Sequence, residues 1–296
     1  MHMYKNQCND QAAGLRRMSV SKPVRVITVT GGKGGVGKTN ISANMAVALA
    51  NKGKKVLLLD ADLGLANLDI VLGVEAKYNL SHVVKGEKSL NEVMVEGPSG
   101  IMIIPASSGV EEMASLGYRE HAGIIREFNS ISFTPDILIV DSAAGIANNV
   151  VSFSRASHEV LVVVCDEPAS ITDAYALIKL LDKEHGVKKF RVVTNMVKTH
   201  ADGRILFNKL MKVTDKFLDV TLDYVGAIPY DEFMKKAIQR QKPVVNAYPR
   251  CPSSLAISKY IDKLDQWPIP TSPSGHIEFF FERLFFSKNQ LTAQMT

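Results

Sequence analysis

The chain has 296 residues, of which 46% are hydrophobic, so it can bury a large core and disorder throughout is excluded. Lysine and arginine number 35 against 30 aspartates and glutamates, but both signs are scattered without basic blocks, which argues against direct nucleic-acid binding. The three cysteines share no metal-ligand spacing, and the sequence has neither a signal peptide nor an apolar run approaching the roughly 18 residues of a membrane span, so we expect a cytoplasmic protein.

Short apolar runs alternate with helical stretches along the chain. Strands are predicted at 24–29, 55–59, 101–104, 137–140, 160–164, 191–194 and 224–228. Helices are predicted at 38–52, 109–129, 145–156, 170–185, 203–218, 231–240 and 253–265. Near-continuous apolar strands that alternate with helices are typical of a doubly wound α/β fold, whose mostly parallel sheet is covered on both faces.

A glycine-rich segment, TGGKGGVGKTN, follows the first strand and precedes the first helix. Within it, residues 32–39 match the pattern G-x-x-x-x-G-K-T of a phosphate-binding P-loop, in the context that a P-loop requires. Its N–H groups would surround phosphate oxygens, Lys38 would reach the β- and γ-phosphates, and Thr39 would ligate Mg²⁺. The alternative is a glycine-rich turn without a ligand. The expected nucleotide contacts here are Gly32, Lys33, Gly34, Gly35, Val36, Gly37, Lys38, Thr39 and Asn40.

Carboxylates follow two other predicted strands. Asp141 ends the apolar run ILIV and is a candidate Walker B residue beside the metal. Asp60 follows Leu59 and Asp62 comes two residues later, at the carboxyl edge of the sheet, where ligands bind in parallel α/β folds.

The segment GGKGGVGKT resembles the deviant Walker A motif of the MinD/ParA group, a branch of the SIMIBI P-loop NTPases. The resemblance implies an ATPase that dimerises on ATP, in which Lys33 reaches the nucleotide of the partner subunit. The alternative for Lys33 is a solvated loop lysine. LLLDADLGLANLDIVLG (57–73) resembles the first switch of this group, which implies that Asp60 lies in the magnesium shell with Thr39 and Asp141. It also implies that Asp62 orients the attacking water, so the residues of hydrolysis would be Lys33, Lys38 and Asp62.

Further segments resemble the second switch and the base pocket of the group. DSAAG (141–145) is similar to the second switch, although Ala143 stands where the cell-division branch usually has proline. Asn195 follows a strand and resembles the asparagine that bonds adenine. IPYDE (228–232) resembles the second wall of the base pocket, which implies contacts from Pro229, Tyr230 and Asp231.

The segment DQAAGLR (10–16) resembles the N-terminal motif of the FlhG/FleN flagellar number regulators, and DEPASITDAY (166–175) is similar to the adenine-side loop of that branch. The resemblance implies that the first segment stimulates the GTPase FlhF, with Asp10, Gln11, Leu15 and Arg16 as its working residues. Other implied partners are a transcription activator of the FleQ/FlrA type and flagellar C-ring proteins. A place at the inner membrane of the cell pole is also implied.

The last thirty residues contain a linker, WPIPTSPSG, followed by an apolar stripe at helical spacing. The FlhG/MinD resemblance implies a membrane-targeting helix that binds inner-membrane lipid, whereas the stripe could equally pack in a groove of its own domain. The stripe consists of Ile277, Phe280, Phe281, Leu284 and Phe285. We therefore expect a partner-activating segment at 1–20, one ATPase domain at 21–266, and the linker and amphipathic helix at 267–296.

The resulting hypothesis is a slow switch ATPase that uses ATP and Mg²⁺, forms a homodimer, and controls the number and placement of polar flagella. A rival from the same fold is a MinD- or ParA-type positioning ATPase. A rival from another class is a metabolic P-loop synthetase that forms amides, and a third is a nucleotide-binding module without catalysis.

Overall fold

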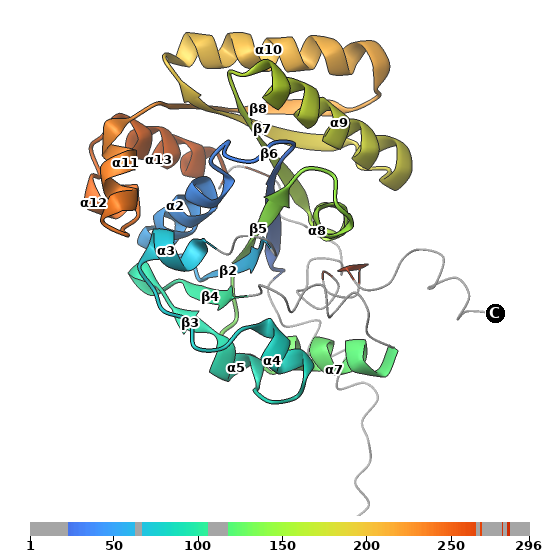
Figure 1. Ribbon diagram of the computed structural model, residues 1–296, viewed down its shortest axis with the longest axis vertical. Helices are drawn as coiled ribbons and strands as arrows, with labels where there is room; N and C mark the ends of the chain where they lie inside the picture. The colour runs from blue at the N-terminus through green and yellow to red at the C-terminus, as the bar shows by residue number, and fades with distance from the viewer. Residues whose placement is uncertain are drawn as a thin grey trace, which may run out of the picture.

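The computed structural model describes residues 23–62, 67–105 and 118–264, together with positions 267, 280, 283 and 284. These residues contain an eight-stranded sheet in the order β3-β4-β2-β5-β1-β6-β7-β8 (Figure 1). Neighbouring strands are parallel, except that β3 is antiparallel to β4. The strands are β1 (Arg25–Gly31), β2 (Val56–Ala61), β3 (Val95–Glu96), β4 (Met102–Pro105), β5 (Ile137–Ala144), β6 (Glu159–Cys165), β7 (Lys189–Val197) and β8 (Thr221–Pro229).

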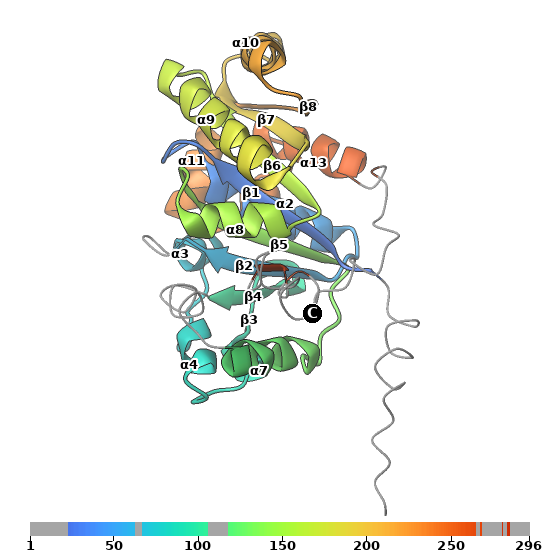
Figure 2. The same ribbon diagram turned by 90° about the vertical axis from the view of Figure 1, so that its right-hand side faces the viewer.

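Helices cover both faces of the sheet, and Figure 2 shows α8 and α9 in front of it with α2 behind. Three apolar clusters, one on the α2 face and two on the opposite face, make up the core. The α2 face carries α2 (Lys38–Asn51), α3 (Leu68–Leu72), α11 (Glu232–Gln239), α12 (Val244–Ala247) and α13 (Pro252–Leu264). The other face carries α4 (Leu80–Val84), α5 (Leu90–Val93), α7 (Tyr118–Asn129), α8 (Asn148–Ala156), α9 (Pro168–His185) and α10 (His200–Phe217).

The predicted fold class is confirmed: this is a doubly wound, mostly parallel α/β sheet in a single domain. Each predicted strand is present within a few residues of its expected bounds. The central strands β1, β2 and β6 are buried along almost their whole length, which explains the continuous apolar runs of β2 and β6. The predicted helices are also present, although the one expected at 109–129 is described only as α7, since 106–117 lie outside the described residues.

Several short elements were not predicted. They are the two-residue strand β3, the 3₁₀ helix η1 (Pro98–Gly100), and the helices α3, α4, α5 and α12, each of which has four or five residues. So short a helix shows at most one turn of apolar periodicity, and a two-residue strand shows none. These elements lie between the major ones and depend on packing against them.

The C-terminal stripe contacts the domain at the two of its positions that the structure describes. Phe280 is fully buried, and its ring stacks on Phe153 of α8 with 6.3 Å between centroids. Leu284 packs against the same cluster, and the guanidinium of Arg155 donates to the carbonyl of Arg283 at 3.1 Å. At both positions, therefore, the stripe packs against its own domain. The other predicted membrane residues, Ile277, Phe281 and Phe285, lie outside the described residues, as do Asp10, Gln11, Leu15 and Arg16.

Candidate nucleotide-binding site

The glycine-rich segment forms a loop between the end of β1 and the start of α2. Gly35 and Gly37 have φ values of 77° and 93°, a left-handed conformation that disfavours residues with a Cβ. Gly32 is needed for a different reason, because a Cβ there would lie 2.1 Å from a backbone carbon of Asp173 in α9. Gly34 and Gly35 are exposed, whereas Val36 is buried in the core and anchors the loop. The loop therefore presents its backbone, followed by the N-terminus of a helix, as anion binding requires.

Lys38, the first residue of α2, crosses this loop from its end toward its beginning. Its side chain is 6% exposed, and Nζ lies 3.5 Å from the carbonyl oxygen of Lys33. Burial lowers the pKa of Lys38, and the charges of Asp141 and Asp62 partly oppose that shift. Burial removes water from this ammonium, and negatively charged phosphate oxygens would replace the lost water as its partners.

Asp60 and Asp141 are register partners on the adjacent strands β2 and β5. The buried Asp141 accepts a hydrogen bond from the hydroxyl of Ser42 at 2.8 Å and another from Thr39, while its Oδ2 has no partner among the described residues. Burial raises the pKa of Asp141 to about 6, and burial together with Asp141 raises the pKa of Asp60 to about 7.

These groups fit Mg²⁺. A buried carboxylate oxygen without a partner lies beside the Thr39 hydroxyl, and both are hard oxygen ligands. No cluster of three or more histidine, cysteine, aspartate or glutamate side chains suited to a metal occurs in the described part of the chain. Mg²⁺ is commonly held by one or two carboxylates together with substrate phosphates and water.

Asp62 lies at the last described position before residues 63–66. Its backbone N–H donates to Oδ1 of Asp60 at 3.2 Å, and its charge acts on both Lys38 and Asp141. The residue expected to orient water is thus placed beside the lysine and the carboxylate of the site.

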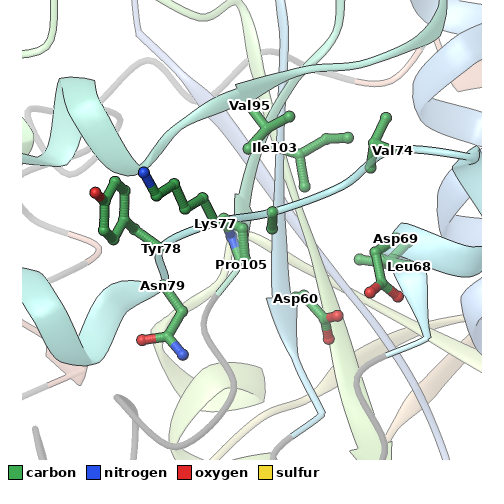
Figure 3. A pocket seen from close by; sticks show the side chains of 11 residues that line it. Asp60, Leu68, Asp69, Val74, Lys77, Tyr78, Asn79, Val95, Ile103 and Pro105 are labelled. Carbon is green, nitrogen blue, oxygen red and sulfur yellow. The ribbon is translucent and has the colours of Figure 1, made fainter.

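A cavity of about 150 Å³ adjoins Asp60 (Figure 3). Its described walls come from the ends of β2 and β4, the start of α3, β3, and the segment 74–79. Lys77 turns its ammonium toward the ring of Tyr78, 5.2 Å from the centroid, and away from Asp60.

Lys33 lies on the outside of the loop, where its ammonium contacts the carboxylate of Glu167 at the N-cap of α9. This contact raises the pKa of Lys33. The sequence did not predict that Glu167 contacts Lys33 or that Ser42 donates to Asp141. Glu167 does lie in DEPASITDAY, the segment that resembles an adenine-side loop.

Asn195, at the carboxyl end of β7, is 7% exposed and donates from Nδ2 to the carbonyl of Val36 at 2.8 Å. It packs so closely on the loop that a Cβ on Gly37 would lie 2.4 Å from Nδ2. The predicted base residue therefore also supports the P-loop.

The segment after β8 has a partly structural role. The carboxylate of Asp231 accepts hydrogen bonds from the N–H of Phe233 and from the N–H and hydroxyl of Ser253, so it joins the starts of α11 and α13. Tyr230 is 60% exposed, and its hydroxyl donates to Glu232. Base-pocket roles for Pro229, Tyr230 and Asp231 stay predictions.

Known proteins similar to this chain also contain a nucleotide-binding domain. Residues 27–244 match the family model described as the CobQ/CobB/MinD/ParA nucleotide binding domain. The chain is 56% identical to the antiactivator FleN of Pseudomonas aeruginosa over 270 residues, which cover 91% of this chain and 96% of the relative. It is 34% identical to the flagellum site-determining protein YlxH of Helicobacter pylori, over 93% of this chain and 98% of the relative.

Solved structures agree with these matches. The septum site-determining protein MinD of Pyrococcus horikoshii, solved as a complex with Mg-ADP, aligns over 82% of this chain and 96% of its own, with a TM-score of 0.61 and 25% identity.

Proposed function

Since the chain belongs to the CobQ/CobB/MinD/ParA family of nucleotide-binding proteins and is a homologue of FleN, we propose that it is an ATP-driven dimerising switch that controls polar flagella. The observation that carries the flagellar part is the 56% identity to the antiactivator FleN along 91% of the chain. The implied partners are the GTPase FlhF and a transcription activator of the FleQ/FlrA type, with flagellar C-ring proteins as further candidates.

The ATPase part of the proposal rests on the arrangement around the P-loop. The loop and Lys38 bind the phosphates, while Thr39 and Asp141 would hold Mg²⁺. Mg²⁺ held by these residues would supply positive charge to the phosphate oxygens during cleavage of the bond to the γ-phosphate. Asp62 orients water, and Lys33 completes the site of the partner subunit. Hydrolysis is slow because the site is complete only in the dimer.

The base contact of Asn195 follows from its position on the loop. Because one N–H of Nδ2 donates to Val36, Oδ1 and the second N–H of Nδ2 stay available to a base. Contact of Oδ1 with the exocyclic amino group of adenine would favour ATP over GTP, because guanine has a carbonyl oxygen at that position.

Size-exclusion chromatography with light scattering tests the switch, since we expect a monomer with ADP and a dimer with ATP. A monomer in both states contradicts the proposal. That result would favour the amide-forming synthetase. In such an enzyme, a small-molecule substrate would raise the rate of ATP hydrolysis many-fold.

A GTPase assay of purified FlhF tests the partner. The full chain should stimulate FlhF, a protein lacking residues 1–20 should not, and a peptide of residues 1–20 should restore part of the effect, since a segment that orders on binding keeps its contacts. The matched control is the peptide with Leu15→Asp, which should be inactive. Equal stimulation by the full and truncated chains would favour the MinD- or ParA-type alternative.

At the membrane, we propose that the C-terminal stripe binds inner-membrane lipid reversibly at the cell pole. No helix among the described residues has the length and apolar character needed to span a bilayer. The proposal therefore concerns insertion of one face into the interface, which requires that face to leave its contacts with the domain.

A further inference from the structure

Helix α10 presents an exposed face on which lysines stand among apolar side chains. The helix lies at the β8 end of the sheet, where it packs on β7 and β8 (Figure 1). Its inward side buries Leu206, Phe207 and Leu210 in the core. The outward side, which we call the basic face of α10, consists of the exposed residues Ile205, Lys209, Lys212, Val213, Lys216 and Phe217.

The apolar members of the basic face are gathered on one helix. Ile205, Val213 and Phe217 are 54%, 38% and 57% exposed, and they are three of the nine large hydrophobic side chains exposed in the described part of the chain. A single exposed apolar side chain needs no explanation, but three along one helix indicate a surface that meets a partner. Phe217 also contacts Tyr175 of α9, with 6.5 Å between ring centroids, so the apolar surface continues to a second helix.

The cations of the basic face are only partly neutralised. Lys209 contacts the carboxylate of Asp166 at 3.7 Å, whereas Lys212 and Lys216 have no acidic partner among the described residues. The ammonium of Lys216 lies 5.2 Å from the ring centroid of Phe217, so charge and apolar surface are adjacent. Two lysines one turn apart are therefore available to an anionic partner.

The acidic residues of α10 do not cancel this charge. The carboxylate of Asp202 accepts hydrogen bonds from the N–H and the hydroxyl of Thr199 at the start of the helix. Asp215 lies on the flank of the face, about 60° around the helix from Lys212, without contacting its ammonium. The face keeps a net positive charge.

A bilayer surface is the partner that uses both kinds of side chain. Apolar groups of a convex helix enter the interface, while ammonium groups meet the lipid phosphates. Nucleic acid would use the lysines through its phosphates, but it would gain little from Ile205, Val213 and Phe217. The combination therefore favours anionic lipid over nucleic acid.

The C-terminal stripe lacks the charge that this face supplies. The segment around it, HIEFFFERLFFSK, has two glutamates against one arginine and one lysine, so its attraction to anionic lipid is weak. Phe280 and α10 both pack on the sheet face opposite α2. One bilayer can therefore meet the stripe and the basic face on the same side of the protein.

We propose that the basic face of α10 is a second membrane contact, which binds anionic lipid headgroups when the C-terminal stripe is inserted. The stripe supplies apolar insertion, and the face supplies attraction to negative charge. This role rests on the membrane binding proposed above, but it assigns the preference for anionic lipid to a different element of the protein.

Co-sedimentation of the full chain tests this role with two kinds of vesicle, phosphatidylcholine alone and phosphatidylcholine with about one third phosphatidylglycerol. The wild type should bind the anionic vesicles more tightly. Lys212→Gln combined with Lys216→Gln should weaken that binding about tenfold, because each lysine near an anionic surface contributes about fivefold. Binding to phosphatidylcholine alone should change by less than about twofold, since its headgroup has no net charge.

The matched control is Lys235→Gln combined with Lys259→Gln. These exposed lysines lie on α11 and α13, on the opposite face of the sheet, and their replacement changes the net charge by the same amount. This variant should keep the wild-type preference for anionic vesicles. Thermal unfolding verifies that both double variants are folded.

Equal weakening by the two double variants, or wild-type affinity of the α10 variant for anionic vesicles, overturns the inference. Binding of a short DNA duplex that the α10 variant loses, with vesicle binding unchanged, would assign the face to nucleic acid instead. Phe281→Glu examines the stripe separately, because wild-type vesicle binding in that variant contradicts insertion of the stripe and leaves the two lysine variants to decide the role of α10. A wild type that binds neither kind of vesicle overturns both proposals.

Discussion

The ammonium of Lys33 and the carboxylate of Glu167 contact each other within a single chain. Lys33 must leave this contact if it is to reach the nucleotide of a partner subunit. Glu167→Gln should therefore lower the ATP concentration that gives half-maximal dimer, by no more than about fivefold, because exposed ion pairs contribute little. Light scattering across an ATP titration measures the shift. Glu184→Gln, on the far turn of α9, is the matched control, and an unchanged midpoint in Glu167→Gln would argue against a restraining contact.

The two loop lysines should have separable effects. Lys38→Ala should abolish nucleotide binding, because the buried ammonium is the cation inside the loop. Lys33→Ala should retain ADP binding and lose hydrolysis, since that side chain lies on the outside of the loop. Titration with ADP, followed by an ATPase assay, distinguishes them. Equal loss of ADP affinity in both variants would show that Lys33 does not act across the dimer.

Asp62→Ala should bind ATP, dimerise and fail to hydrolyse, with a fall in kcat of about a hundredfold or more. The reason is that a group that orients water lowers the barrier without contacting the phosphates in the ground state. Light scattering over time should show a dimer that persists after the wild type has returned to monomer. A variant that stays monomeric with ATP would instead give Asp62 a role in assembly.

Two variants test separately whether the C-terminal stripe packs against the domain and whether it binds lipid. Phe280→Ala should lower the free energy of unfolding by about 3–5 kcal/mol, because it removes a fully buried ring from Phe153. Thermal unfolding measures this as a loss of several degrees. Phe281→Glu should abolish co-sedimentation with liposomes, because a charge cannot enter the apolar interface cheaply. Absence of lipid binding in the wild type would leave packing as the sole role of the stripe.

The metal-free protein should lose stability as the pH rises through about 7. Burial and the charge of Asp141 raise the pKa of Asp60 to about 7, so the folded chain holds this proton more tightly than the unfolded chain does. The stabilising contribution is complete below the pKa of the unfolded group, near 4, and disappears as the folded group ionises. Melting temperatures at pH 5.5 and pH 8 in EDTA should differ less for Asp60→Asn than for the wild type. An equal pH slope in the two proteins would assign the effect to other groups.

The sequence by itself determined the fold class and the centre of the site. Continuous apolar runs such as 160–164, alternating with helical stretches, are typical of strands covered on both faces, and the spacing from Gly32 to Thr39 between a strand and a helix leaves few structures other than a P-loop. Asp60 and Asp141 were identified for the same reason, since strand ends of a parallel sheet meet at one edge.

Only the tertiary structure decided which groups touch. Ser42 and Asp141 are 99 residues apart in the chain, and Lys33 and Glu167 are 134 apart, so no local pattern connects either pair. The apolar stripe near the C-terminus is compatible with lipid or with protein, and the contact of Phe280 with Phe153 favours protein at that position because only the fold brings α8 there. Likewise, the sequence marked Asn195 as polar at a strand end, but its bond to Val36 depends on β7 lying beside the loop. Periodicity and motif spacing report local geometry, whereas hydrogen-bond partners are selected by how the elements pack.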